Sequence, residues 1–200
     1  MRGVVLLLVL CFSGAVHAQH FPFEYWHEGK IVLESGDTLK GNIKYDLQND
    51  LIQFSVGNKL ESYTARKLSY FEIFDQTVKK YRQFYAIPYA VSGAYKAPVL
   101  FELLTEGKMT LLCRESVEYR SYSNSFYSYG MSTRLVLVYH YFLLNENGSI
   151  DTFDGKRADL LKLMGDKSNQ VEKFIRSNKL DLSDRNEFVQ IVHYYNSLYK

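Results

Sequence analysis

The sequence predicts an α+β fold, in which a bent antiparallel sheet or open barrel of about eight strands carries a small helical cap at the C-terminus. Three observations predict it. Residues 29–153 form strand-like runs rich in Tyr, Phe, Val and Ile, residues 154–200 carry apolar side chains at helical spacing, and polar or glycine-containing turns separate the strand-like runs. The chain is 46% hydrophobic and 16% aromatic, which is enough to bury a sizeable core.

Turn signals divide the strand-like part into hairpins. Ser35-Gly36-Asp37 lies within residues 29–46, and Gly36 can adopt the positive φ that a tight hairpin turn requires. Asn147-Gly148 between two apolar runs is the strongest signal of this kind. Further strands are expected at residues 51–56, 69–74, 79–87, 99–105, 108–117, 134–144 and 149–153.

The last part of the chain predicts two or three short helices. Asp154 is the expected N-cap of the first helix and Ser183 that of the last, because short oxygen-bearing side chains accept hydrogen bonds from the free N–H groups of a helix start. Apolar side chains recur on one face of the last helix, and we expect this face to pack on the chain's own sheet rather than on a partner. The face consists of Phe188, Ile191, Val192, Tyr195 and Leu198.

The N-terminal segment has the three-part order of a cleavable signal peptide. Arg2 supplies a positive charge, residues 4–12 form an apolar run too short to span a bilayer, and Val16-His17-Ala18 places small residues where a signal peptidase requires them. We therefore expect cleavage after Ala18. One alternative is a buried N-terminal strand or helix. Another is a lipoprotein signal ending at Cys11, against which Leu10 argues because that position calls for a small residue.

This division gives a signal peptide at residues 1–18, a β-rich domain at 19–153 and a helical cap at 154–200 packed on the same domain. The expected location is the periplasm, the cell envelope or the extracellular space. Loss of Arg2 lowers the formal net charge from +2 to +1, so charge gives no argument for a nucleic-acid partner. The mature chain would keep one cysteine, which excludes an intrachain disulfide, and it contains no apolar run of transmembrane length.

Two parts of the chain together resemble a known family. The opening Gly29-Lys-Ile-Val-Leu with Gly36-Asp-Thr-Leu-Lys-Gly41, and the ending Phe188-Val-Gln-Ile-Val-His-Tyr-Tyr-Asn196, resemble small uncharacterised secreted or periplasmic proteins of Bacteroidetes-type bacteria. The resemblance implies a cell-envelope or extracellular location and a β-rich domain with a helical tail, and it transfers no active site.

A second likeness concerns the first hairpin alone. The pattern of Gly36, Gly41, Asp46 and Asn49 is similar to the first motif of Sm-like small barrels, but the Asp-to-Asn interval is short and the second motif is missing. The likeness implies a strongly bent, SH3-like sheet. We do not extend it to RNA binding, because the chain is nearly neutral and is expected to be exported.

A search for catalytic or metal-binding patterns yields no candidate, and we expect no cofactor. The histidines outside the signal peptide lack ligand spacing within any one element, and no Gly-x-Ser-x-Gly motif occurs. Cys113 shares a strand face with Met109 and Leu111, which predicts a buried, inert thiol. The histidines are His20, His27, His140 and His193. Four acidic residues lie near one hairpin, and we interpret them as an ordinary acidic edge: Glu102, Glu106, Glu115 and Glu118.

The segment 119–130 stands out in composition. Its tyrosine, serine and asparagine side chains are typical of adaptable contact surfaces, and aromatic rings also stack on sugars. The competing interpretation is a mobile insertion between two strands. The ligand-contact candidates are Tyr119, Tyr122, Phe126, Tyr127 and Tyr129.

Two functional classes follow from these observations. The first is an exported cell-envelope module with a non-enzymatic binding or structural role, whose partner would be a polysaccharide or another envelope protein. The second is a periplasmic or secreted hydrolase whose site is assembled only in three dimensions. A pocket with converging polar groups would favour the hydrolase.

Overall fold

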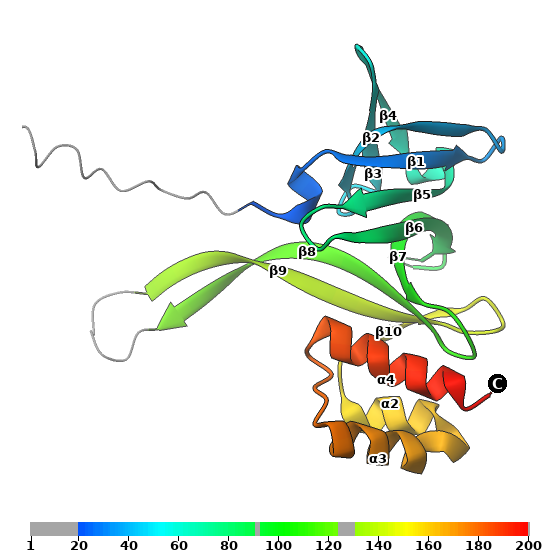
Figure 1. Ribbon diagram of the computed structural model, residues 1–200, viewed down its shortest axis with the longest axis vertical. Coiled ribbons are helices and arrows are strands. Elements are labelled where there is room, and N and C mark those ends of the chain that lie inside the picture. Colours follow the sequence, from blue (N-terminus) through cyan, green and yellow to red (C-terminus); the bar gives the residue numbers. More distant parts are fainter. Residues whose placement is uncertain (1–19, 91–92, 124–130, 200) are drawn as a thin grey trace, which may run out of the picture.

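The computed structural model describes residues 20–90, 93–123 and 131–199 (Figure 1). The expected signal peptide and its cleavage point after Ala18 lie outside these residues. Within them, the chain forms one open, ten-stranded antiparallel sheet followed by three short helices. The β-rich α+β class is therefore confirmed, whereas the expected number of about eight strands is wrong.

The order of the strands in the sheet is β10-β9-β8-β7-β6-β5-β1-β2-β3-β4, so all neighbouring strands except β5 and β1 are also consecutive along the chain. The strands are β1 (His27–Leu33), β2 (Thr38–Asp46), β3 (Leu51–Val56), β4 (Lys59–Thr64), β5 (Leu68–Asp75), β6 (Lys80–Tyr89), β7 (Ala97–Thr105), β8 (Thr110–Ser123), β9 (Met131–Leu144) and β10 (Ile150–Phe153). The helical turns and helices are η1 (Pro22–Glu24), η2 (Ala65–Lys67), α2 (Arg157–Leu163), η3 (Gly165–Lys167), α3 (Ser168–Asn178) and α4 (Arg185–Ser197).

The sequence prediction missed β4, which forms one edge of the sheet. Nearly all of its side chains are exposed, so the strand lacks the apolar alternation on which the prediction depended. Lys59 and Glu61 place charges on this edge, which is a common protection against pairing with another chain.

The sheet is strongly bent. The Tyr45 hydroxyl on β2 donates a hydrogen bond of 2.9 Å to Glu115 on β8, although four strands separate β2 from β8 in the sheet. In a flat sheet these strands would lie roughly 24 Å apart, at about 4.8 Å per strand. The sheet therefore curls so that β2 and β8 approach each other, as the sequence predicted, without closing into a continuous barrel.

β7 and β8 are paired over only a short stretch. Their register runs from Glu102 opposite Cys113 only to the turn that joins them. Beyond it, side chains take the place of a neighbouring strand at Leu100. The Leu100 N–H donates to Asp50 at 2.8 Å, and Arg114 donates to the Leu100 carbonyl at 2.7 Å. Arg114 also forms an ion pair with Asp50, which ties the β2–β3 turn to β8.

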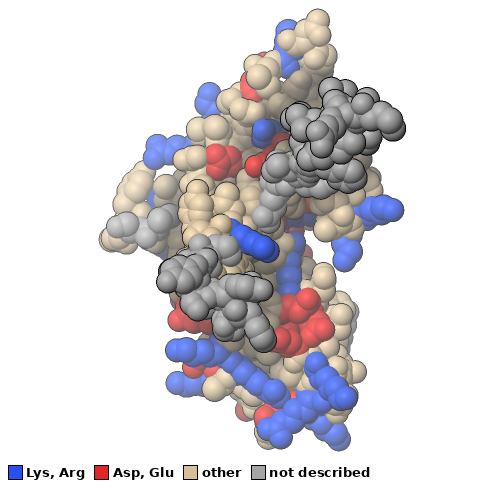
Figure 2. Space-filling model, turned by 90° about the vertical axis from the view of Figure 1, so that its left-hand side faces the viewer, with Lys and Arg blue, Asp and Glu red and all other residues tan. Residues whose placement is uncertain are grey.

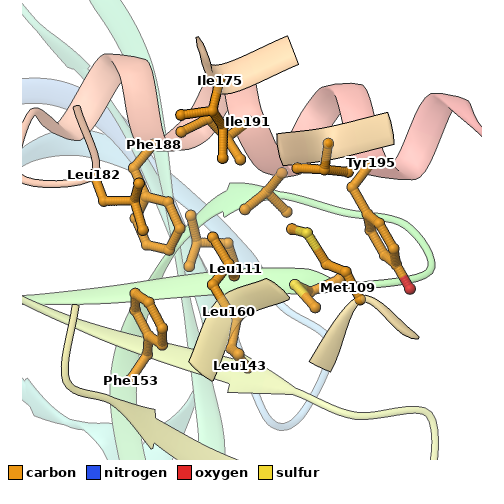
Figure 3. Close-up of a cluster of buried hydrophobic side chains, with 13 residues drawn as sticks. Met109, Leu111, Leu143, Phe153, Leu160, Ile175, Leu182, Phe188, Ile191 and Tyr195 are labelled. Atoms are coloured by element: carbon orange, nitrogen blue, oxygen red, sulfur yellow. The ribbon is translucent and has the colours of Figure 1, made fainter. Parts of the chain in front are cut away.

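The sheet carries two main hydrophobic cores. The first fills the inside of the bend, where Phe71 of β5 and Phe84 of β6 stack with ring centroids 4.5 Å apart. The second lies between the helices and β8 to β10 (Figure 3). There Phe188 and Ile191 of α4 pack over Leu111 of β8, and all three are fully buried. The apolar face of the last helix therefore packs on the chain's own sheet, as predicted.

The N-cap residues of two helices differ from those predicted, and a side chain near the end of α4 bonds to the backbone before β8. Asp184, and not Ser183, caps α4, because its side chain accepts hydrogen bonds from the N–H groups of Asn186 and Glu187. Lys156, and not Asp154, is the N-cap residue of α2, and its side chain makes no capping bond. Near the end of α4, Asn196 accepts a hydrogen bond from the Met109 N–H at 2.8 Å and donates one to the Met109 carbonyl at 2.9 Å.

The distal parts of β8 and β9 project from the body as a two-stranded arm (Figure 1). We define the arm as residues 114–123 and 131–140, which are paired in register from Arg114 opposite His140 to Ser123 opposite Met131. β7 pairs with β8 only up to Cys113, and β10 pairs with β9 only up to Tyr141. Both outer edges of the arm are therefore unpaired by strands within the described residues. No helix in the described part of the chain is long and apolar enough to cross a membrane.

Candidate functional site

The arm carries the described members of the predicted contact surface. Tyr119 is 77% exposed and Tyr122 is 46% exposed, and both belong to β8. The interpretation of residues 119–123 as part of a loop is thus wrong, because β8 and β9 continue to pair with each other after their outer neighbours have ended. The other candidates, Phe126, Tyr127 and Tyr129, lie outside the described residues.

The two tyrosines lie on opposite faces of the arm, because their separation in a strand is an odd number of residues. Tyr119 is directly opposite Leu135, and Val117 on the same face is directly opposite Leu137. Leu135 is 36% exposed. This face of the arm is therefore an apolar and aromatic strip that extends from Val117 to the exposed Tyr119.

At its base, the strip meets a hollow of about 270 Å³ between β8 and the curled end of the sheet. Phe23 of η1, Leu47 of the β2–β3 turn and Val117 of β8 supply apolar walls. The remaining lining residues are polar or aromatic: Glu24, Lys44, Tyr45, Asp46, Gln48, Glu115 and Ser116. The hollow is large enough for one aromatic or aliphatic side chain of a partner, but small for a typical drug-sized ligand.

Behind this hollow lies a buried charge cluster around Arg82 of β6. The Arg82 guanidinium donates to Glu102 through two nitrogens, at 2.9 and 2.7 Å, and to Asp75 at 2.9 Å. It also forms an ion pair with Glu115 and donates at 2.8 Å to the Tyr45 hydroxyl. All five residues are at least nine-tenths buried. One cation thus joins β2, β5, β6, β7 and β8.

A second arginine extends the cluster to the helical cap. Arg185, in the first turn of α4, forms an ion pair with Glu102 and lies over the ring of Tyr139, 5.0 Å from its centroid. The cluster therefore contains two cations and three carboxylates. It links the cap to the middle of the sheet by charge, in addition to the apolar packing.

The protonation states in the cluster favour a structural role. Burial alone would raise the pKa of Asp75, but hydrogen bonds from Thr77 and Arg82 outweigh it and lower that pKa below its usual value. Burial lowers the pKa of Arg82, while Glu102 and the other acceptors raise it well above its usual value, so Arg82 stays charged. Burial raises the pKa of Tyr45 well above its usual value, so its hydroxyl remains a neutral donor. The pKa shifts of Asp75, Arg82 and Tyr45 all lead away from neutral pH, so these three residues are not poised for proton transfer there.

A serine and a histidine do meet on the arm. The Ser116 hydroxyl lies 2.8 Å from Nε2 of His140, and a Glu118 carboxylate oxygen lies 3.6 Å from the same nitrogen. A catalytic triad needs the carboxylate on the other ring nitrogen, where it orients the imidazole. The pair is also exposed to solvent, with 48% of the His140 side chain accessible. This geometry does not favour the hydrolase.

Other predicted residues lie as follows. Cys113 is a fully buried free thiol, as expected, and burial raises its pKa well above the usual value. His27 is buried, with 1% exposed; its Nε2 bonds to the Pro22 carbonyl at 2.7 Å, and its ring lies against Tyr45. Among the described residues, no group of three or more His, Cys, Asp and Glu side chains is arranged to hold a metal ion.

Sequence reasoning missed the charge cluster. Glu102 and Glu115 were interpreted as part of an acidic hairpin edge, whereas the structure buries both against Arg82. One signal was available, because Glu102 shares the inward face of β7 with Leu100, and Arg82 shares that of β6 with Phe84. Charged residues at inward positions of neighbouring strands indicate an internal ion pair.

Charges of both signs cover the side of the molecule from which the arm projects (Figure 2). Lys and Arg side chains gather over the helices at the lower end of this view, and acidic side chains lie among them. Within the helical cap, Glu172 forms ion pairs with Arg176, at 2.6 Å, and with Arg157, at 3.8 Å. The surface near the arm thus carries both signs.

Comparison with known proteins adds no assignment, since no family model, no curated protein and no solved structure matches the chain.

Proposed function

We propose that this chain is an exported cell-envelope module that binds a polysaccharide or another envelope protein, without catalysis, through the β8–β9 arm. The observation that carries the proposal is the exposed apolar strip of the arm, with Tyr119 77% and Leu135 36% exposed on a ribbon whose outer edges pair with no other strand among the described residues. A two-stranded ribbon is marginally stable by itself, so its projection from a well-packed body calls for a partner.

The chemistry of the arm agrees with a binding role. Tyrosine provides a large, rigid contact area with a polar tip, and aromatic side chains carry a disproportionate share of interface energy. The hollow at the base of the strip offers a place for one further side chain of the partner. Among the described residues, the carboxylate beside the Ser116–His140 pair is that of Glu118, which lies at the same ring nitrogen as the serine, so this pair does not support the hydrolase.

The signal-peptide pattern and the resemblance to secreted Bacteroidetes-type proteins support export. Mass spectrometry of the protein recovered from the host envelope should find Gln19 as the first residue, either free or cyclised. Recovery of the intact chain, beginning with Met1, from the cytoplasm would contradict export.

We further propose that the first half of the sheet is an opened SH3-like barrel. The order β5-β1-β2-β3-β4, with the 3₁₀ turn η2 between β4 and β5, supports this. In this arrangement the barrel half is a scaffold, and β8 and β9 are the addition that carries the binding surface.

The test replaces Tyr119, Tyr122 and Leu135 with serine and measures binding to immobilised envelope polysaccharide and to immobilised envelope protein. Tyr95→Ser is the matched control, because Tyr95 is 71% exposed and lies outside the arm. We expect the triple variant to lose at least tenfold in affinity for one of the two probes, as removal of interface aromatics commonly does, and the control to bind as the parent does. Equal binding by the triple variant and the parent would refute the proposal.

A further inference from the structure

Among the described residues, the arm has an unpaired backbone edge along the outer side of β8. β7 pairs with β8 only up to Cys113, so the backbone groups along the outer edge from Glu115 to Ser123 meet no strand within the described residues. An unpaired strand edge is a template for pairing with another strand.

Charges along this strand suggest what pairs there. Arg120 lies directly opposite Arg134 of β9, and like charges in directly opposite positions destabilise a strand pair. Neither arginine makes an ion pair with another described residue. An acidic side chain brought to the outer edge of β8 beside Arg120 would relieve this repulsion.

We propose that the partner at this edge is a second copy of the same chain, whose β8 pairs antiparallel with this β8 about a two-fold axis at Tyr119. The inference rests on the proposed binding role of the arm and names one partner of it. In such a pairing, directly opposite residues lie on the same face of the sheet, and neighbouring residues of a strand lie on opposite faces. One residue of β8 must therefore lie opposite the same residue of the second copy, with the axis between them.

The charges and the free length of the edge select that residue. With the axis at Tyr119, Glu118 of each copy is opposite Arg120 of the other, which gives two opposite-charge pairs. An axis at Glu118 or at Arg120 would instead place like charges opposite each other. An axis at Val117 would place Arg114 opposite Arg120, and one at Ser121 would leave both charges without a charged partner. An axis at Ser116 would place Glu118 opposite Arg114, but Arg114 already pairs with Asp50, and Arg120 would then lie opposite Leu112, whose edge β7 occupies.

The outer edge of β9 makes no comparable selection. Its free part, residues 131–140, contains a run of Leu and Val side chains at 135–138, so several registers would bury similar apolar area. Pairing through β8 also leaves both faces of each arm free. The two apolar strips then lie side by side on one four-stranded ribbon, which doubles the surface offered to an envelope partner.

The first test uses charge reversal and sedimentation of the purified protein. Glu118→Arg or Arg120→Glu alone converts two attractive pairs into two repulsive ones. The dissociation constant of the dimer should therefore rise by about tenfold or more. The double variant Glu118→Arg/Arg120→Glu restores both pairs and should dimerise like the parent. Arg120→Glu also removes the repulsion with Arg134 inside one arm, so its melting temperature should not fall while its dimer weakens.

The second test uses cysteine cross-linking. Residue 119 faces itself across the axis, so Tyr119→Cys should form a disulfide-linked dimer under mild oxidation, whereas Tyr122→Cys and Leu135→Cys should not. The native Cys113 is fully buried and should not contribute.

Three results would overturn the inference: a parent that is monomeric at every concentration, a dimer that neither single reversal weakens, or a disulfide dimer of Leu135→Cys in place of Tyr119→Cys. Each is separable from the proposed function. If the parent is monomeric but the serine triple variant still loses probe binding, the dimer is refuted and the binding role stands. If the dimer is confirmed but the triple variant binds the probes as the parent does, the proposed envelope partner is refuted and the dimer stands.

Discussion

Replacement of Arg82 by methionine tests whether the buried cluster holds the bent sheet together. Methionine keeps much of the side-chain volume but removes the cation that contacts Asp75, Glu102 and Glu115. Those three carboxylates are at most 4% exposed, and only Glu102 keeps a second cation, Arg185. Removal of one partner from a buried ion pair typically costs about 3–5 kcal/mol, because the remaining charge is left uncompensated.

This cost is a large part of the stability of a domain, which is typically about 5–15 kcal/mol. For a chain of this size, the melting temperature should fall by roughly 10 °C, at about 2–4 °C per kcal/mol. The assay is chemical and thermal denaturation of the variant beside Arg176→Met. In that control, the lost ion pair with Glu172 is at the helix surface, and its loss should cost less than about 0.5 kcal/mol.

The pH dependence gives the prediction a second readout. The pKa of Asp75 is lowered in the folded protein, so its contribution to stability is present above the unfolded pKa of about 4 and is lost as the pH falls through the folded pKa. The parent should therefore lose stability below about pH 4. In Arg82→Met the uncompensated carboxylates favour protonation, so the difference between variant and parent should shrink as the pH is lowered.

The reasoning would be refuted if Arg82→Met were no less stable than Arg176→Met at neutral pH. It would equally be refuted if the difference between parent and variant grew on acidification. Added Glu115→Gln should recover part of the loss in the Arg82→Met background, since it removes one of the unpaired charges.

Three further outcomes are expected. Tyr45→Phe removes the hydroxyl that donates to Glu115 and accepts from Arg82, and denaturant melts should show a loss of about 1–3 kcal/mol. Asn196→Ala leaves the N–H and carbonyl of Met109 without their partners, so it should cost a similar amount, about 1–3 kcal/mol, and loosen α4 first in limited proteolysis. The Cys113 thiol is buried and its pKa is raised, so it should resist iodoacetamide in the native protein and react after denaturation; rapid native labelling would contradict its place in the core.

Much of the fold was predictable from the sequence because local signals agree with the tertiary arrangement. Glycine-containing turns, alternation in strands such as β8 and the apolar face of α4 all indicated the elements that form. The misses have physical causes. β4 is an exposed edge strand without alternation, and the α4 cap depends on backbone geometry that places Asp184, one residue after Ser183, at the helix start.

The candidate site was predictable only in part. Composition pointed to Tyr119 and Tyr122, but it could not show that they lie on a paired ribbon, since β8–β9 pairing beyond the body depends on register. The charge cluster joins Asp75, Arg82, Glu102 and Glu115 with Tyr45, residues far apart in the sequence. Asp75, Arg82 and Glu102 lie on the neighbouring strands β5, β6 and β7, where charged residues at inward positions gave a signal. The bend of the sheet brings Tyr45 of β2 to Glu115 of β8, and no local pattern encodes that approach.

The most direct measurement of the binding role is backbone hydrogen exchange, with the protein alone and on immobilised envelope material. Alone, amides in the arm should exchange faster than those of the central strands β5 to β7, because a two-stranded ribbon opens easily. On the envelope material, the account predicts slowed exchange at residues 116–123 and 133–139, with little change elsewhere. Unchanged exchange in the arm, together with protection over α2 and α3, would contradict the account and place the binding surface on the helical cap.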